Sequence, residues 1–171
     1  MFKLVKPTLF MEKEYIDYIT EWEAAGEKIV PNASKRDNMS FKDLVNKWEE
    51  YESENMYEKE LVPSSMYFLI DNHNKIYGAI DIRHDLNDYL LQYGGHIGYG
   101  IRPSQRRKGY AFQMLSLALP IAKELGINKA LITCDKTNLG SAKTIIDNGG
   151  ILENEVKNGD EITQRYWLEL S

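Results

Sequence analysis

A short basic turn, Arg106-Arg107-Lys108-Gly109, is the stretch whose residue types and spacing point most clearly to chemistry. Residues 97–101 before it alternate in type as a strand does, and Pro103 ends that pattern because proline has no N–H to donate to a ladder. After the turn, apolar residues recur with helical spacing, at Phe112, Leu115, Leu119, Ala122 and Leu125. The sequence therefore predicts a strand, a turn and then a helix that begins at the turn.

A turn in this position is suited to an anion. The first N–H groups of a helix have no partner within the helix, and the helix dipole makes that end partly positive. Gly109 lets a ligand approach the backbone where a Cβ would block it, and Arg106, Arg107 and Lys108 add positive charge. The ligand that fits these features is a phosphate or a pyrophosphate.

The residues around this turn resemble a known family, the GCN5-related N-acetyltransferases (GNAT). Residues 106–111, Arg-Arg-Lys-Gly-Tyr-Ala, fit its Gln/Arg-x-x-Gly-x-Gly/Ala signature. Residues 94–103 resemble the fourth strand of the family and residues 130–135 its fifth. The Asn-x-x-Ser motif that opens the next helix, and the glycine that ends this helix, are matched by Asn138, Ser141 and Gly149. The resemblance covers about residues 63–171.

This resemblance implies how a cofactor binds. In the family the loop cradles the pyrophosphate of acetyl-coenzyme A (acetyl-CoA), which implicates Arg106, Arg107, Lys108, Gly109, Tyr110 and Ala111. Backbone groups where the fourth and fifth strands splay apart hold the pantetheine and the carbonyl, which by position implicates Tyr99, Gly100 and Ile101. Asn138 and Ser141 are expected to contact the cofactor. The alternatives are that Asn138 only opens the helix and that Ser141 bonds to its own first turn.

Acetyl transfer also needs a base that deprotonates the amine. Many relatives carry a glutamate in the region of His96, and a histidine, which titrates near neutral pH, can do the same work. On a strand, His96 would point the same way as Gly98 and Gly100, toward a face cleared of side chains. His96 is therefore the candidate base, and the alternative is a structural histidine held by hydrogen bonds.

The leaving thiolate must be protonated or otherwise stabilised. The family often places a tyrosine for this purpose seven residues after the Asn138 position, and Ile145 stands there in this sequence. Tyr99, Tyr110 or a tyrosine of the connection before residue 95 could substitute, and we take Tyr99 as the candidate. Coenzyme A could also leave without a dedicated acid.

Composition excludes several classes of protein. The 171 residues suggest one domain, 1–171, and 43% hydrophobic with 27% charged residues is typical of a globular chain. The net charge of −5 argues against general attraction to nucleic acid, and no apolar run approaches the ~20 residues of a membrane span. The single cysteine, Cys134, fits a reducing compartment, so a cytoplasmic location is expected, and no metal is predicted.

Other periodic segments predict the elements that position this site. Strands are expected at residues 2–6, 66–71, 75–83, 128–134, 151–156 and 162–170, and the last two form a hairpin through Asn158-Gly159. Helices are expected after Thr8, with Met11, Tyr15, Ile16 and Ile19 on one face and an end at Gly26, after Ser40, and over residues 108–125 and 141–148. Pro120 predicts a kink near Leu117 or an early end of its helix.

These observations predict an α/β fold. The GNAT resemblance implies a mixed, mostly antiparallel central sheet that splays between strands 4 and 5, with helices on both faces. In relatives, the first two helices form one wall of the acceptor site. Here their sequence does not indicate which amine is the acceptor. The acidic side chains of residues 49–54 are interpreted as a solvated helix face, with attraction of a cationic amine as the alternative.

The function that the resemblance implies is acetyl-CoA-dependent N-acetyl transfer to the amine of an unidentified small molecule or peptide. One alternative is a non-catalytic acyl-CoA sensor or regulatory module, motivated by Ile145 at the tyrosine position. A second is a nucleic-acid-binding protein that uses Arg106 to Lys108, which the negative net charge disfavours. A homodimer paired through the last strand is a further candidate, since Arg165 to Leu168 could be either core or an edge used in pairing.

Overall fold

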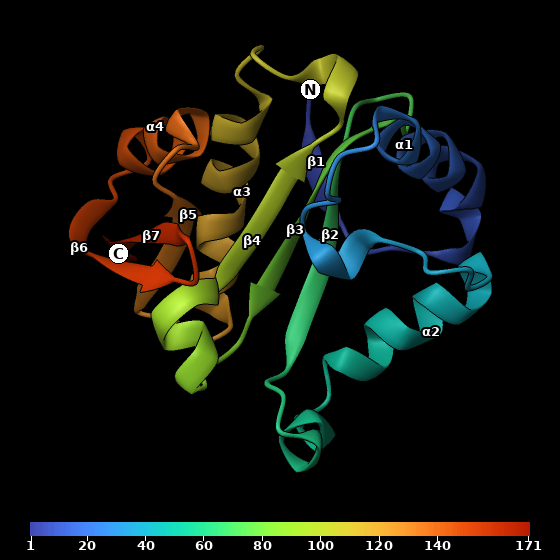
Figure 1. Ribbon diagram of the computed structural model, residues 1–171. Helices are drawn as coiled ribbons and strands as arrows, with labels where there is room; N and C mark the ends of the chain where they lie inside the picture. The colour runs from blue at the N-terminus through green and yellow to red at the C-terminus, as the bar shows by residue number, and fades with distance from the viewer.

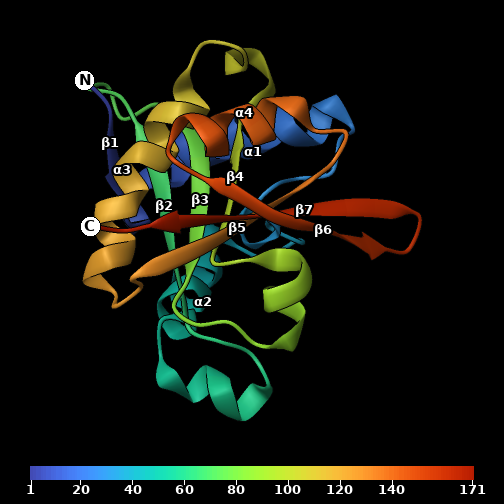
Figure 2. The ribbon, with the colours of Figure 1, turned by 90° about the vertical axis from the view of Figure 1, so that its left-hand side faces the viewer.

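The computed structural model describes all 171 residues and contains two antiparallel sheets (Figure 1). The first sheet has the order β1-β2-β3-β4, with β1 (Lys3–Val5), β2 (Ser64–Ile70), β3 (Ile76–Arg83) and β4 (Ile97–Ile101). The second has the order β5-β7-β6, with β5 (Lys129–Asp135), β6 (Ile151–Asn158) and β7 (Glu161–Glu169). Figure 2 shows the β6–β7 hairpin reaching sideways from the second sheet.

Four helices pack around these sheets. They are α1 (Glu12–Ala25), α2 (Phe41–Tyr51), α3 (Tyr110–Glu124) and α4 (Leu139–Asp147). In Figure 1, α1 and α2 lie on one side of β4, while α3, α4 and the second sheet lie on the other. Short helical turns fill the connections, at Leu9–Met11, Asn32–Ser34, Glu54–Lys59, Leu90–Gly94 and Pro103–Gln105. None of the helices is both long and apolar enough to cross a membrane.

The two sheets meet beside the start of β4 and separate beyond it. No ladder pairs β4 with β5. Instead, the His96 backbone nitrogen donates to the Leu131 carbonyl at 2.7 Å, and the Leu131 nitrogen donates to His96 Nδ1 at 2.9 Å. The approach is close enough that a Cβ at Gly95 would lie 2.6 Å from the Leu131 oxygen. The α/β fold with a sheet split between strands 4 and 5 is therefore confirmed.

The first sheet separates two hydrophobic cores. One, of 17 buried residues, joins this sheet to α3 and to the second sheet, and Ile80, Met114 and Ile132 belong to it. The other, of 14 buried residues, lies under α1 and α2. The rings of Tyr15, Trp48 and Phe68 pack there edge-to-face or tilted, with centroids 5.7–5.9 Å apart. The core under α3 lies on one side of the first sheet, and the core under α1 and α2 lies on the other.

Most local signals are confirmed. Ser40 caps α2, because its Oγ accepts from the Asp43 N–H at 3.1 Å, and Gly26 ends α1 with φ +68°. Thr8, however, makes no capping hydrogen bond, since a short turn precedes α1, and Ile16 is exposed. The buried face of α1 is Tyr15, Tyr18, Ile19 and Trp22.

Two further expectations differ in detail. Helix α3 continues through Pro120 to Glu124, so the early end is wrong. The ~3 kcal/mol cost of an interior proline is outweighed by Met114 and Leu115, which are fully buried and contribute ~1.5–3 kcal/mol each. In the C-terminal hairpin, Asn158 pairs with Glu161, so the turn is Gly159-Asp160, one residue later than expected.

Candidate active site

A cavity of about 680 Å³ opens where β4 and β5 diverge. Two groups of residues form its walls. One wall, here called the cofactor wall, comes from β4, the N-terminus of α3 and α4, with Tyr99, Gly100, Ile101, Gln105, Arg106, Arg107, Gly109, Tyr110, Ala111, Phe112, Asn138, Gly140, Ser141, Lys143, Thr144 and Asp147. The other, here called the α1 wall, comes from α1 and the segment after it, with Trp22, Glu27, Lys28 and Val30.

The N-terminus of α3 presents unpaired backbone donors to this cavity. None of the backbone N–H groups from Arg106 to Phe112 donates to another protein group, whereas the next, of Gln113, donates to the Gly109 carbonyl at 3.2 Å. Arg107 and Gly109 both have positive φ, +62° and +84°, which curls this backbone into a concave loop. Concave loops of this kind bind anions, and the 15-residue helix behind it adds its dipole.

The cavity brings together ten of the twelve residues that the sequence singled out. They are Tyr99, Gly100, Ile101, Arg106, Arg107, Gly109, Tyr110, Ala111, Asn138 and Ser141. His96 and Lys108 do not line it. The Lys108 ammonium donates instead to Gln105 Oε1 at 3.2 Å.

Tyr99 and Ser141 meet across the opening between the sheets. Tyr99 Oη lies 2.9 Å from Ser141 Oγ, and both residues line the cavity. Burial raises the pKa of Tyr99 to about 12, although the hydrogen bond with Ser141 opposes that rise. The phenol is therefore protonated at neutral pH and could donate a proton into the cavity.

Asn138 and Ile145 have structural positions on α4. Asn138 Oδ1 accepts from the Ser141 N–H at 3.0 Å, so the Asn138 side chain caps α4. Asn138 also lines the cavity. Ser141 Oγ bonds to Tyr99 rather than to its own first turn. Ile145, at the position where relatives often carry the tyrosine, is fully buried in the core under α3.

His96 lies where the sheets converge, 7% exposed, with Nδ1 accepting from the Leu131 N–H. Burial lowers the pKa of His96 to about 4, so its imidazole is neutral at physiological pH. The expectation of a face cleared of side chains is wrong. A Cβ at Gly98 would lie 3.0 Å from the Arg83 guanidinium, and one at Gly100 would lie 2.2 Å from the Val30 carbonyl oxygen. This geometry favours the structural alternative for His96.

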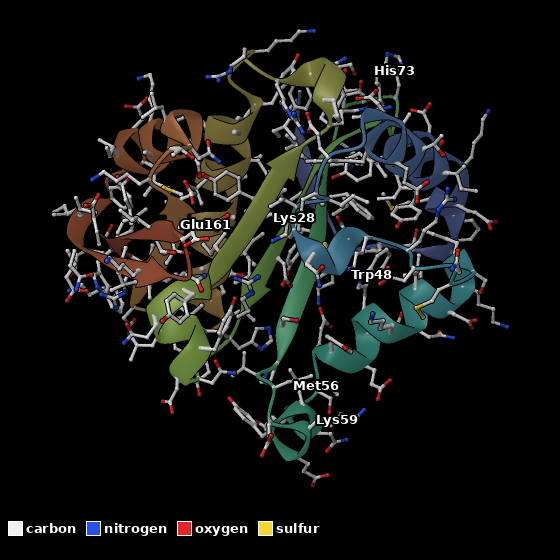
Figure 3. The ribbon with its side chains drawn as sticks, in the orientation of Figure 1. Lys28, Trp48, Met56, Lys59, His73 and Glu161 are labelled. Atoms are coloured by element: carbon white, nitrogen blue, oxygen red, sulfur yellow. The ribbon has the colours of Figure 1, made fainter.

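The α1 wall is the part of the site that sequence reasoning missed. Val30 presses its backbone onto Gly100, and Trp22 packs under the Arg106 guanidinium at 4.8 Å from the ring centroid. Figure 3 labels Lys28 on this segment, beside β4. Glu27 pairs with Arg106 at 2.7 Å across 79 positions of sequence (106 − 27), a distance at which no local pattern signals contact.

Helix α1 is also fastened to the connection between β4 and α3. The buried Arg102 guanidinium pairs with Asp17 at 2.9 Å and with Glu21 at 3.0 Å. The Ser104 N–H donates to the second oxygen of Glu21 at 2.8 Å, and these bonds lower the pKa of Glu21 against the opposing effect of burial. The C-terminal half of α1 is thus held against the segment that leads into the concave loop.

Nowhere in the chain do three or more His, Cys, Asp or Glu side chains gather in a way that could hold a metal ion. Cys134, on β5, is buried, and burial raises the pKa of its thiol to about 11.

The family model described as "Acetyltransferase (GNAT) domain" matches residues 12–150. A search of curated proteins gives no match. Solved structures with similar folds include a ribosomal-protein-S5-alanine acetyltransferase from Vibrio fischeri. It has a TM-score of 0.70 and 14% identity, over 99% of this chain and 93% of that one.

Two further structures were solved with ligands. A ribosomal L7/L12 alpha-N-protein acetyltransferase in complex with coenzyme A has a TM-score of 0.70 and 15% identity, over 99% of this chain and 94% of that one. The Microcin C7 self-immunity acetyltransferase MccE, in complex with acetyl-CoA and AMP, has a TM-score of 0.66 and 18% identity, over 98% and 92%. At these identities the likeness to solved structures shows the fold.

Proposed function

The chain belongs to the GNAT acetyltransferase family, and from this premise we propose which of its residues bind acetyl-CoA and which take part in the transfer. Membership makes the protein an N-acetyltransferase with acetyl-CoA as donor, and the non-catalytic alternative is not favoured. The residue assignments and the class of acceptor given below are proposals.

The observation that carries the cofactor assignment is the run of unpaired N–H groups from Arg106 to Phe112. These groups, the positive φ at Arg107 and Gly109, and the start of α3 fit the two charges of a pyrophosphate. The backbone of this loop and the N-terminus of α4 would hold the diphosphate end of the cofactor. When bound, acetyl-CoA supplies the thioester whose acetyl group is transferred.

Tyr99 is the proposed acid. It lies on β4 at the split, its Oη is bonded to Ser141, and burial keeps it protonated. Gly100 and Ile101 line the same cavity, where a backbone N–H group could polarise a carbonyl. As the new C–N bond forms and the C–S bond breaks, Tyr99 would give its proton to the departing thiolate and regain one from the acetylated nitrogen, and Ser141 would hold the phenol in position. His96 is not proposed as the base, because its Nδ1 already accepts from the Leu131 N–H.

The acceptor amine is proposed to bind against the α1 wall. α4 and the concave loop occupy the opposite side of the cavity, so Trp22 and the segment Glu27–Val30 are the surface left to meet a second substrate. Small-molecule and peptide amines both remain candidates. Two of the similar solved structures are acetyltransferases that act on ribosomal proteins.

The test is a calorimetric titration of acetyl-CoA, followed by thiol release in the presence of amines, polyamines, amino acids and peptides with free N-termini. We expect binding, and coenzyme A release with one class of amine. If acetyl-CoA fails to bind, the assignment of the concave loop is overturned. Binding without release on a broad panel would revive the sensor alternative.

A homodimer is the proposed assembly. The last strand is not an edge, as one reading of Arg165 to Leu168 expected, because β7 lies between β5 and β6. The edge of the second sheet is β6, whose eight residues are exposed or half-buried, so one side of its backbone is free to pair with another strand. Light scattering coupled to size exclusion measures the mass, and a mass near 19.8 kDa would contradict this proposal. The cytoplasm is the proposed location, on the grounds of composition given above.

A further inference from the structure

Two neighbouring arginines of the concave loop point in different directions. Arg107 has φ +62°, which turns the chain between it and Arg106. Arg106 reaches toward α1, where it contacts Glu27 and Trp22. Arg107 reaches toward α4, where its Nη1 lies 3.3 Å from the position of a Cβ at Gly140. Although both line the cavity, the two side chains meet different walls of it.

The Arg106 guanidinium is already engaged. Its Nε donates to the Ile101 carbonyl at 3.1 Å, its Nη2 pairs with Glu27 at 2.7 Å, and its plane lies over the Trp22 ring. Each contact alone is weak at a site as exposed as this one. Together they fix one rotamer between the end of β4 and the α1 wall. The Glu27 carboxylate has its pKa lowered by this arginine, so the pair is charged on both sides at neutral pH.

Arg107 is free by comparison. Its side chain is exposed and makes no hydrogen bond or ion pair with another protein group. It faces the N-terminus of α4, where Gly140 leaves room beside the unpaired donors of the loop. An arginine with all its donors unused, aimed into an anion site, is the one available to a phosphate.

We propose that Arg106 is a positioning residue that fastens the α1 wall, and that Arg107 is the arginine that binds the phosphate of the cofactor. Through Glu27 and Trp22, Arg106 holds the segment that places Val30 on Gly100 and so gives the acceptor side of the cavity its shape. This inference rests on the proposed function, because it divides the basic loop between the two substrates.

The experiment compares Arg106→Gln, Arg107→Gln and Glu27→Gln. Acetyl-CoA titration by calorimetry gives affinity, and amide hydrogen exchange of residues 26–31 reports the α1 wall without any acceptor. For Arg107→Gln we expect acetyl-CoA affinity to fall at least ~10-fold, since a charge-assisted contact is lost, with exchange in residues 26–31 unchanged. For Arg106→Gln and Glu27→Gln we expect affinity within about 3-fold of the wild type and clearly faster exchange.

Two controls sharpen the comparison. Lys108→Gln removes a positive charge from the same loop, but Lys108 lies outside the cavity, so it measures the general effect of charge. Arg106→Lys keeps a charge for Glu27 but loses the planar stack on Trp22, and its exchange rate should fall between those of the wild type and Arg106→Gln. With the amine found by thiol release, Arg106→Gln should raise the KM for the amine and leave the KM for acetyl-CoA nearly unchanged.

Two results would overturn the inference. One is an equal loss of acetyl-CoA affinity in Arg106→Gln and Arg107→Gln. The other is tighter acetyl-CoA binding in Glu27→Gln, which would mean that Glu27 competes with a phosphate for Arg106. If the wild type binds no acetyl-CoA at all, the proposed function fails instead, so the two failures can be told apart.

Discussion

The two walls of the cavity are built by different means. The cofactor wall is made largely of backbone: unpaired N–H groups, a positive φ at Arg107 and Gly109, and the N-terminus of α3. The α1 wall is made of side chains brought from far away in sequence, with Trp22 and Glu27 held by Arg106. A phosphate can be recognised by local backbone geometry, whereas a second substrate is recognised by whatever long-range packing places opposite it.

The largest expected effect is at the concave loop. Gly109→Val puts a β-branched residue at φ +84° on the cavity surface, so acetyl-CoA affinity should fall at least ~100-fold as charge-assisted hydrogen bonds are lost. Gly126→Val is the matched control, since Gly126 has φ +93° and open space around it but lies outside the cavity. Both variants should lose ~1–2 kcal/mol of stability, and only the first should lose binding by calorimetry. Equal acetyl-CoA affinities in Gly109→Val and Gly126→Val would contradict the assignment of the concave loop to the cofactor.

Next in size is the effect of Tyr99→Phe on turnover. Removing the hydroxyl that meets Ser141 should lower kcat by ~100-fold, with acetyl-CoA affinity nearly unchanged. Because burial raises the pKa of Tyr99 to about 12, wild-type kcat should show no alkaline fall from this group between pH 6 and 9. Tyr77→Phe is the control, because it loses a hydrogen bond to Asp71, keeps the ring that packs on Tyr110, and alters no residue that lines the cavity. Full activity in Tyr99→Phe would leave the enzyme without a dedicated acid.

A smaller change should follow from Gly100→Ala, where the two walls touch. The new Cβ would lie 2.2 Å from the Val30 oxygen, which is backbone and must shift, so unfolding free energy should drop by ~1–3 kcal/mol. Acetyl-CoA affinity should change less than about 3-fold, because the concave loop is untouched. At Gly98 the Cβ would meet the end of the Arg83 side chain at 3.0 Å, a longer distance than the 2.2 Å to backbone at Gly100, so Gly98→Ala should cost less in thermal unfolding. A larger loss of stability in Gly98→Ala than in Gly100→Ala would contradict a tight contact between Gly100 and Val30.

The smallest effect at neutral pH concerns His96, where the sheets converge. Its pKa is lowered to about 4 in the fold, against about 6.5 unfolded, so the unfolded state binds more protons in this window. The stability that His96 contributes is present above pH 6.5 and lost as pH falls toward 4, at most about 1.4 kcal/mol per pH unit. In chemical unfolding from pH 7 to 4, His96→Asn should show a shallower decline than the wild type. Its kcat should keep the wild-type pH profile, and loss of the rise in kcat with increasing pH would restore His96 as the base.

The cofactor side of the molecule could be predicted from the sequence because its signals are local. Gly109, Asn138 and Ser141 stand at element ends, where a single residue type fixes the backbone or a cap. The α1 wall could not be predicted, since the pairing of Glu27 with Arg106 depends on how α1 docks. The structural role of His96 could not be predicted for the same reason, because its partner Leu131 lies 35 residues away, on a strand in another sheet.

The division into two cores has a consequence for how such a protein changes over generations. Tyr15, Trp48 and Phe68 pack with one another and not with Met114 or Ile132, which belong to the other core. Substitutions among the residues of the core under α1 and α2 that do not touch the concave loop, unlike Trp22, can therefore accumulate while the loop keeps its geometry. A lineage built on this plan can exchange one amine for another by drift in half of its interior, without passing through ancestors that have lost acetyl-CoA.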